Sequence, residues 1–288
     1  MRIFEWTKRK SRGEIILYSM VSLLFFIVAA SYVYILVWAF ISGAKTHMEI
    51  VMDPFGLPKE WHFEHYLEVF SKLEVNGNNF LNMLFNSIWF SVVNVLIHQF
   101  LSITLAYACA KYRFPGSRWV YMMVLIVMTL PLYGNGGGIY KLYYDLGLLN
   151  SYAEVISATN VFTTFFMYYY AFWKNVSWAY AEAAMTDGAN AFQIYFKVMF
   201  PQAKAIFGAL FLTNWLSKWN SYESALIYLP KLPTLPVGIY QFNLEMLRRA
   251  RLDILFAACI IITIPALVLF IVFNKTITTN VSIGGIKG

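Results

Sequence analysis

The sequence is poor in charged residues and in cysteine. Asp, Glu, Lys and Arg together make up 13% of the 288 residues, whereas hydrophobic residues make up 59%. A soluble domain carries roughly 25% charged residues, so this shortage excludes an ordinary soluble protein and indicates an integral membrane protein. Both cysteines, Cys109 and Cys259, lie inside apolar runs, so we predict small core residues and no disulfide framework.

The sequence also lacks motifs for chemistry of its own. No Walker A motif is present, and the glycine-rich stretch 134–138 lacks the Gly-Lys-Ser/Thr ending of a phosphate loop. The four histidines form no ligand cluster with the cysteines, and we interpret His62 and His65 as an incidental exposed pair. We find no convincing Ser-His-Asp arrangement. We therefore predict that the chain is not an enzyme, has no catalytic residue and no metal site, and binds no cofactor itself.

Six apolar runs predict an all-α, polytopic membrane protein. A spanning helix needs about 20 mostly apolar residues, and the runs lie at 15–41, 80–110, 119–133, 154–173, 204–229 and 253–273. We divide the chain into an N-terminal segment (1–14), a six-span domain (15–273) and a C-terminal tail (274–288). The glycine-rich stretch is expected to break or cap the third span instead of being helical.

The placement of lysine and arginine orients these spans. With six spans, the basic N-terminal segment, the gaps after the second and fourth runs and the tail all lie on one side, which the positive-inside rule makes the cytoplasm. The net charge of +7 is therefore interpreted as membrane anchoring and not as a nucleic-acid surface. Arg248, Arg249 and Arg251 break the rule in the last outer gap, where they either anchor the helix at lipid head groups or contact an acidic partner or substrate.

The fifth run carries a candidate solute path. Its aromatic and charged residues fall at the spacing of one helix face, and they are Trp215, Lys218, Trp219, Tyr222 and Glu223, with Asn220 near the edge. Charged groups at membrane depth normally face a bundle interior or a wet cavity. Aromatic rings beside hydrogen-bonding groups suit a sugar. The alternative is aromatic packing between helices. In the second run, Asn94, His98 and Gln99 are interpreted as structural hydrogen-bonding residues.

The polar gap after the fourth run holds the most specific motif, at 177–201. Five residues stand at a fixed spacing across it, and they are Glu182, Ala183, Ala184, Gly188 and Pro201. Two short helices joined at a glycine, with an outward carboxylate, suit docking into the cleft of a partner. The alternative is an amphipathic hairpin that lies on the lipid surface.

The local sequence predicts how these two helices begin and end. Ser177 is the expected N-cap of a helix that runs to Asp187, and Gly188 is expected to end it in the left-handed conformation. Asn190 and Gln193 predict a capping box at the second helix. The second helix should have one apolar face, formed by Phe192, Tyr195, Phe196 and Met199. The proline at 201 should then close it.

The motif at 177–201 resembles the Glu-Ala-Ala (EAA) loop of ABC importer permeases, with Val198 and Phe200 in place of the usual Ile and Leu. Over nearly its whole length the chain resembles the permeases of carbohydrate ABC importers, in particular the smaller, six-span subunit of the maltose type. Further resemblances are Phe55-Gly-Leu-Pro58, Asn86-Ser87, Pro131-Leu-Tyr133, Leu146-Gly-Leu148, Trp219-Asn220 and the Gly284-Gly-Ile-Lys-Gly288 end. In the fifth run Ser221 replaces the acidic residue that usually follows Trp-Asn, and Glu223 comes two positions later.

The resemblance implies a type I importer in a bacterial or archaeal cell membrane, with both termini in the cytoplasm. A second permease subunit, two ATPase subunits that hold ATP and Mg²⁺, and an extracytoplasmic binding protein would complete it. Glu182, Asp187 and Gly188 would couple the permease to the ATPase, and Lys287 and Gly288 would reach the ATPase dimer. Arg248 and Arg249 would contact the binding protein. The permease would then move a carbohydrate by alternating access; the alternatives are a non-sugar solute, an ATP-independent channel or an intramembrane enzyme.

Overall fold

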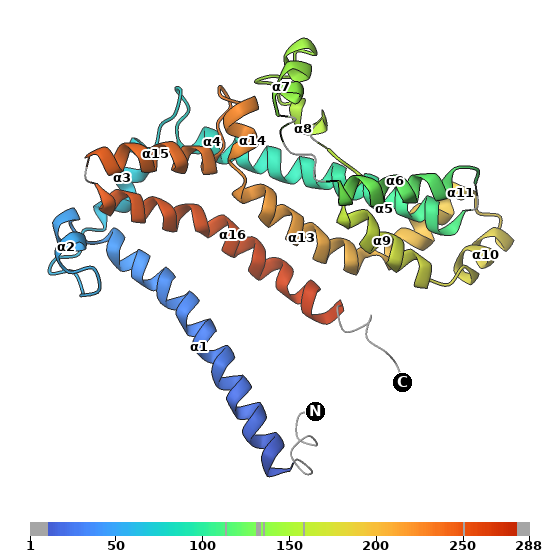
Figure 1. The fold of residues 1–288 in the computed structure, drawn as a ribbon, viewed down its shortest axis with the longest axis horizontal. Coiled ribbons are helices and arrows are strands. Elements are labelled where there is room, and N and C mark those ends of the chain that lie inside the picture. The colour runs from blue at the N-terminus through green and yellow to red at the C-terminus, as the bar shows by residue number, and fades with distance from the viewer. Residues whose placement is uncertain are drawn as a thin grey trace. The chain divides into compact units, whose positions relative to one another are not determined.

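The protein is described by a computed structural model that covers residues 11–112, 114–130, 134, 136–157, 159–249 and 251–280. Within these residues the structure is helical, with one isolated bridge between Val75 and Asn78 and no strand (Figure 1). The predicted all-α fold is therefore confirmed for the described part of the chain.

The chain forms two compact units. The first comprises Met1–Lys72 and Asn243–Ile261, and the second comprises Leu73–Phe242 and Ile262–Gly288. Both the helix α15 (Leu235–Arg249) and the helix α16 (Leu252–Asn280) contribute to each unit. The predicted division into an N-terminal segment, a membrane domain and a tail follows the apolar runs and not the compactness of the chain, so these two units do not test it. It stays a prediction.

The first unit is built on α1 (Arg12–Gly43), α2 (His47–Met52) and α3 (Glu64–Lys72). Ser11 and Glu14 form a capping box at the start of α1, which is apolar on all sides. At its other end, a Cβ on Gly43 would lie 2.9 Å from the backbone nitrogen of Ala257 in α16. Only glycine allows the end of α1 to approach α16 this closely.

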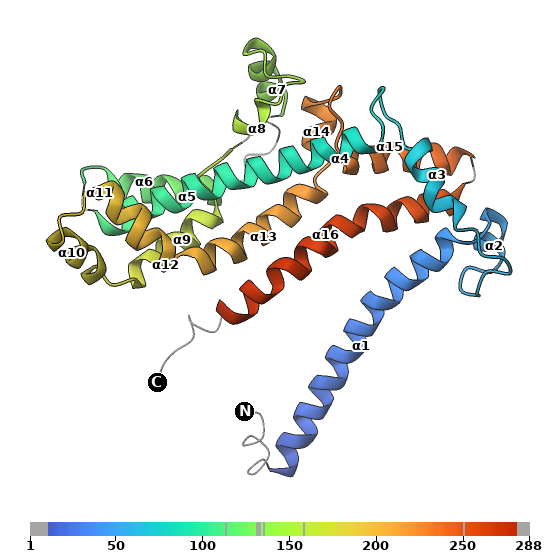
Figure 2. The same cartoon turned by 180° about the vertical axis from the view of Figure 1, so that it is seen from behind.

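The second unit contains the remaining helices. Its first half consists of α4 (Phe80–Ile88), the π-helical turn η2 (Trp89–Val93), α5 (Asn94–Lys111), α6 (Ser117–Thr129), α7 (Gly136–Asp145), α8 (Glu154–Ser157) and α9 (Thr164–Asn175). Its second half consists of α10 (Ala179–Thr186), α11 (Ala191–Gln193), the π-helical turn η3 (Ile194–Met199), α12 (Phe200–Gln202), α13 (Lys204–Asn220) and α14 (Glu223–Tyr228). Figure 2 shows α4 and α5 running on as one long helix.

The core of the second unit lies where α5 packs against α9. Trp173 is fully buried, and its indole N–H donates to the Ile103 carbonyl at 3.1 Å. The Tyr169 hydroxyl donates to Gln99 Oε1 at 2.5 Å, while the Gln99 amide donates to the Leu210 carbonyl in α13 at 3.1 Å. These bonds join three helices through polar groups that lipid could not satisfy.

Three described helices are long and apolar enough to cross a membrane, and they are Gly13–Gly43, Phe80–Lys111 and Leu252–Ile271. They correspond to the first, second and sixth predicted runs. The third run appears as the shorter apolar helix α6, and residues 131–133 lie outside the described part. The expected number of six spans and the orientation of the termini therefore remain predictions.

The fourth and fifth runs are not single helices, which corrects the expectation. The fourth is interrupted between α8 and α9, where Asn160 Oδ1 accepts from the Phe162 N–H at 2.9 Å and forms an Asx turn. The fifth ends at Asn220 because Ser221 takes an extended conformation. The glycine-rich stretch is also different from the expectation, since Gly136–Gly138 form the first residues of α7. Hydropathy detects apolar length but not such local side-chain turns.

Candidate functional site

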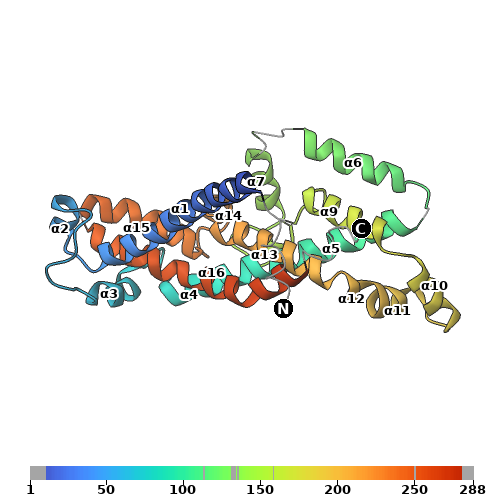
Figure 3. The same ribbon diagram turned by 90° about the horizontal axis from the view of Figure 1, so that it is seen from below.

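The Glu-Ala-Ala loop is formed by α10, α11, η3 and α12 at one end of the second unit, and α14 lies toward the other end (Figure 3). Gly188 has a φ of +79°, so the predicted left-handed turn after α10 is confirmed. The predicted capping box is also confirmed, because Asn190 Oδ1 accepts from the Gln193 N–H at 2.9 Å and Gln193 Oε1 accepts from the Asn190 N–H at 2.9 Å. The two turns fix the angle between α10 and α11.

The side chains that the motif singles out point away from the core. Glu182, Ala183, Asp187 and Gly188 are exposed, and Ala184 is half-buried. Within the described residues the Glu182 carboxylate forms no ion pair. Large apolar residues are also exposed on this loop: Tyr180 and Met185 on α10, Phe192 on α11 and Phe196 on η3. The loop thus presents the carboxylates of Glu182 and Asp187 together with exposed apolar side chains.

Three details of the loop were predicted wrongly. The N-cap of α10 is Trp178 instead of Ser177, whose hydroxyl accepts from the Ala179 N–H at 3.3 Å. Pro201 does not close the second helix but lies in the first turn of α12, where the missing N–H is tolerated. Phe192 and Phe196 do not share a buried face with the other predicted residues, because η3 has more residues per turn than the α-helix assumed for the spacing.

The buried side of this helix is set by the tyrosine that precedes Phe196. Tyr195 packs against Tyr107 with ring centroids 4.8 Å apart, and its hydroxyl lies 2.7 Å from Thr104 Oγ1. Ile194 and Met199 are buried with it. The loop is therefore joined directly to the α5–α9 core.

A cavity of about 240 Å³ lies at the C-terminal end of α13. Its walls come from the α4–α5 helix, α7, α8, α13 and α14. The polar residues that line it include Ser87, Asn94, Glu154, Lys218, Ser224 and Thr234, and its aromatic residues are Phe90, Tyr143, Trp219 and Tyr228. The cavity therefore combines hydroxyl and amide groups with aromatic rings.

The two charged residues of the cavity have opposite signs. Glu154 is 5% exposed, whereas Lys218 is exposed, and the two are close enough to interact electrostatically. Burial of a carboxylate is costly unless a cation or hydrogen bonds compensate it. The pair keeps the net charge of the cavity near zero.

The predicted solute path is only partly assembled. Lys218 and Trp219 line the cavity, but Trp215 is 1% exposed and donates to Ser91 Oγ at 3.0 Å, so it packs against η2. Tyr222 lies beyond the end of α13 and stacks on Tyr240 with centroids 4.8 Å apart.

Glu223 does not share the predicted face either, whereas Asn220, which was expected only near its edge, is the last residue of α13. Glu223 is the first residue of α14, and Asn220 donates to the Leu216 carbonyl at 2.8 Å. The helical break at 221 therefore removes Tyr222 and Glu223 from the predicted single face, because the spacing argument assumed that α13 continued.

Sequence reasoning missed Glu154 as a site residue. The only signal was a carboxylate at the edge of an apolar run. Asn94 also reaches the cavity, although its amide donates to the Val155 carbonyl at 2.9 Å. His98 and Gln99 have cross-helix partners as well, since His98 Nδ1 lies 2.9 Å from Asn214 Nδ2. The structural interpretation of these three polar residues is confirmed.

The remaining predicted contacts are on the outer segment and the tail. Arg248 and Arg249 are exposed in the last turn of α15, and Arg249 Nη2 lies 2.6 Å from Glu245 Oε1. Their contact with a binding protein stays a prediction. Lys287 and Gly288 lie outside the described residues.

Comparison with known proteins places this architecture in a family. Residues 100–282 match the family of binding-protein-dependent transport system inner membrane components. The chain is 30% identical to the diacetylchitobiose uptake system permease NgcG of Streptomyces coelicolor, over 86% of this chain and 82% of that protein. It is 26% identical to the arabinooligosaccharide permease AraQ of Bacillus subtilis, over 93% and 95% of the two chains.

A solved structure shares the fold. A chain from the crystal structure of a bacterial ABC transporter involved in the import of the acidic polysaccharide alginate aligns with a TM-score of 0.75 at 24% identity. The alignment covers 93% of this chain and 99% of that one. At this identity the likeness establishes the fold alone.

The fold, the exposed loop and these matches define a membrane transport component and not an enzyme. The chain belongs to the binding-protein-dependent transport system inner membrane components, the permease subunits of ABC importers. This membership confirms the resemblance stated from the Glu-Ala-Ala loop.

Proposed function

We propose that the chain is one of two permease subunits in an ATP-driven importer of a neutral oligosaccharide. The observation that carries the substrate class is the cavity at the end of α13, where aromatic rings face hydroxyl and amide groups. A sugar offers apolar C–H faces to such rings and hydroxyls to such polar groups. The named functions of NgcG, AraQ and the melibiose/raffinose/stachyose permease MelC support a carbohydrate.

The charge of the cavity favours a neutral substrate. Lys218 would attract an acidic sugar, but Glu154 lines the same cavity and compensates it. Because the two charges compensate each other, the cavity offers hydrogen-bonding groups to a substrate but no net electric field that would select substrates of one charge.

The loop is proposed as the ATPase docking surface. Two ATPase subunits on the cytoplasmic side would hold ATP and Mg²⁺, and a basic residue of one of them would pair with Glu182. Exposed Phe192 and Met185 would supply apolar contact around that ion pair. ATP-driven closure would then move the loop together with the α5–α9 core, to which Tyr195 joins it.

The remaining features follow from the same proposal. The chain would cross the bacterial or archaeal cell membrane six times with both termini in the cytoplasm. A second permease subunit would complete the path, and an extracytoplasmic binding protein would deliver the sugar near Arg248 and Arg249. Alternating access requires two arrangements of the permease pair, and the loaded binding protein and ATP-driven closure of the ATPases would bias the balance between them.

The test is uptake by the complex reconstituted in vesicles with its partner subunits. We expect transport of neutral oligosaccharides in preference to acidic ones, amino acids or phosphate. Trp219→Leu should lower sugar uptake about two- to tenfold, since aromatic packing contributes about 0.5–1.5 kcal/mol beyond its area. The matched control is Trp215→Phe, which should weaken packing but not substrate preference. Uptake of a non-sugar solute alone would overturn the proposal.

A further inference from the structure

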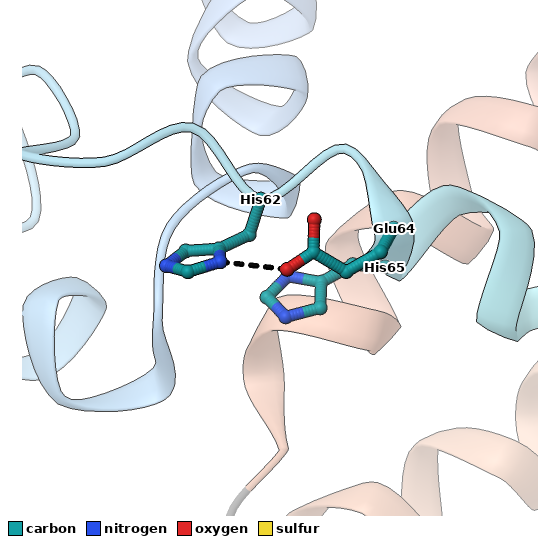
Figure 4. A group of neighbouring side chains, drawn as sticks. All are labelled: His62, Glu64 and His65. Carbon is teal, nitrogen blue, oxygen red and sulfur yellow. Dashed lines mark hydrogen bonds and ion pairs between the residues drawn. The ribbon is translucent and has the colours of Figure 1, made fainter.

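A group of three side chains in the first unit has the composition of a metal site. His62, Glu64 and His65 each offer one ligand atom, and these atoms all lie within 4.8 Å of one another. Figure 4 shows the two imidazoles and the carboxylate gathered where the chain enters α3. His65 is 8% exposed, His62 is half-buried and Glu64 is exposed, so the group is open to solution on one side.

The spacing of these atoms is close to that of a bound ion. His62 Nδ1 lies 2.7 Å from Glu64 Oε1, and the two imidazole centroids are 5.4 Å apart. Zinc bonds of about 2.0–2.2 Å place tetrahedral ligand atoms about 3.3–3.6 Å apart. Small side-chain rotations would bring the three atoms to that separation, because two of the three residues are not fully buried.

The second observation is a conflict at the buried ring. His65 Nδ1 lies 3.2 Å from the Gly43 carbonyl oxygen, and its Nε2 lies 3.4 Å from Asp253 Oδ2. Both neighbours are hydrogen-bond acceptors, and Asp253 is itself held by Arg251 at 2.7–3.0 Å. A neutral imidazole carries one proton, so it can donate to only one of them.

A cation at Nδ1 removes this conflict. The ring proton would then stay on Nε2 and be donated to Asp253. A metal-bound histidine characteristically donates its other ring N–H to a carboxylate, which fixes the tautomer and the ring orientation. Asp253 comes from the start of α16, far from the ligands in sequence, and its side chain is 3% exposed.

We propose that His62, Glu64 and His65 bind one divalent transition-metal ion of the zinc type. Imidazole nitrogens and a carboxylate oxygen match the ligands that Zn²⁺ takes in proteins, and the exposed side leaves a position for water. Asp253 is the positioning residue for His65. This site replaces the interpretation of the two histidines as an incidental pair. The ion would tie the segment before α3 to the first turn of that helix.

The experiment is a titration of the purified full-length chain, freed of metal by a chelator, with Zn²⁺ followed by calorimetry. We expect one site per chain in the micromolar range. His62→Asn and Glu64→Gln should each weaken binding at least tenfold, and both side chains are exposed enough for the variants to fold. The control is His47→Asn in the same unit, whose ring accepts from the Leu252 N–H at 3.4 Å and should leave the affinity unchanged.

A second readout separates the positioning role from a ligand role. Asp253→Asn should weaken binding 10–100-fold, the usual loss for an outer-shell partner. The visible absorption of bound Co²⁺ should keep its shape in this variant and change in His62→Asn. Absence of Zn²⁺ binding, or equal affinity in wild type and both ligand variants, overturns the proposal.

Discussion

The loop at 177–202 and the cavity at the end of α13 belong to the same unit, but they are built in opposite ways. The loop is made of consecutive residues, and its functional side chains are exposed around Glu182. The cavity is made of residues from separate helices, and its carboxylate, Glu154, is buried. We propose the first as a surface for a partner and the second as an enclosure for a sugar.

The difference decides how each region should respond to substitution. A variant in the loop changes contacts that exist only when a partner is bound, so the isolated chain should stay folded. A variant in the cavity changes contacts within the chain, so its folding and its transport should change together. Three sets of substitutions separate these responses, and they run from the largest expected effect to the smallest.

Glu182→Ala should have the largest effect, because it removes the exposed carboxylate that is proposed to pair with a basic residue of the ATPase. A hydrogen bond to a charged group contributes about 1.5–3 kcal/mol, so sugar-stimulated ATP hydrolysis by the complex should fall about tenfold or more. The stability of the isolated chain should change by less than about 0.5 kcal/mol. Glu60→Ala, at another exposed glutamate, is the control. Normal stimulated hydrolysis by the Glu182→Ala complex would falsify this role.

Gly188 tests the turn next to that carboxylate. With a φ of +79° an L-residue is strained by about 1–2 kcal/mol, although a Cβ there would meet no atom within 4 Å. Gly188→Val should therefore reduce uptake more than Gly188→Ala, and Gly188→Asn should be tolerated best, since asparagine adopts this conformation more readily. Near-wild-type uptake from both the valine and the alanine variant would show that the tight turn is not required.

The charge pair of the cavity should show the smallest effect. Lys218→Gln leaves the buried carboxylate of Glu154 without its cation, and Glu154→Gln removes the need for one. The double variant should therefore be more stable than the sum of the single variants predicts. We expect a coupling of about 0.5–1 kcal/mol in thermal unfolding, because Lys218 is exposed and water screens the pair. Additive losses would show that the two residues act independently.

The same contrast explains what the sequence could predict. The capping box of Asn190 and Gln193 and the left-handed Gly188 depend on neighbours within a few positions, and both were predicted correctly. Trp215, in contrast, is separated by 124 positions from its partner Ser91, and no local pattern distinguishes this packed indole from Trp219 beside the cavity.

The ends of helices were also difficult to predict from the sequence. Hydropathy is continuous through 204–229, yet Ser221 ends α13 because its backbone turns to an extended conformation. The face predicted for Tyr222 and Glu223 was lost with that helix. The role of Asp253 could not be predicted from the sequence either, since its contact with His65 forms only when α16 and α3 pack in the first unit.

The π-helical turn η3 has a consequence for the length of this part of the chain. It lies within the loop, ahead of the α-helices that lead to the cavity, and its hydrogen-bonded turn closes one residue later than that of an α-helix. Deleting one residue between Ile194 and Met199 would let the backbone close as a regular α-helix. Because the π-helical turn accommodates its extra residue by widening, the helix beyond such a deletion would keep nearly the same direction relative to Glu182, whereas a deletion in a regular α-helix would rotate everything beyond it by about 100°. This stretch should therefore tolerate the loss of one residue better than the regular α-helices on either side of the loop.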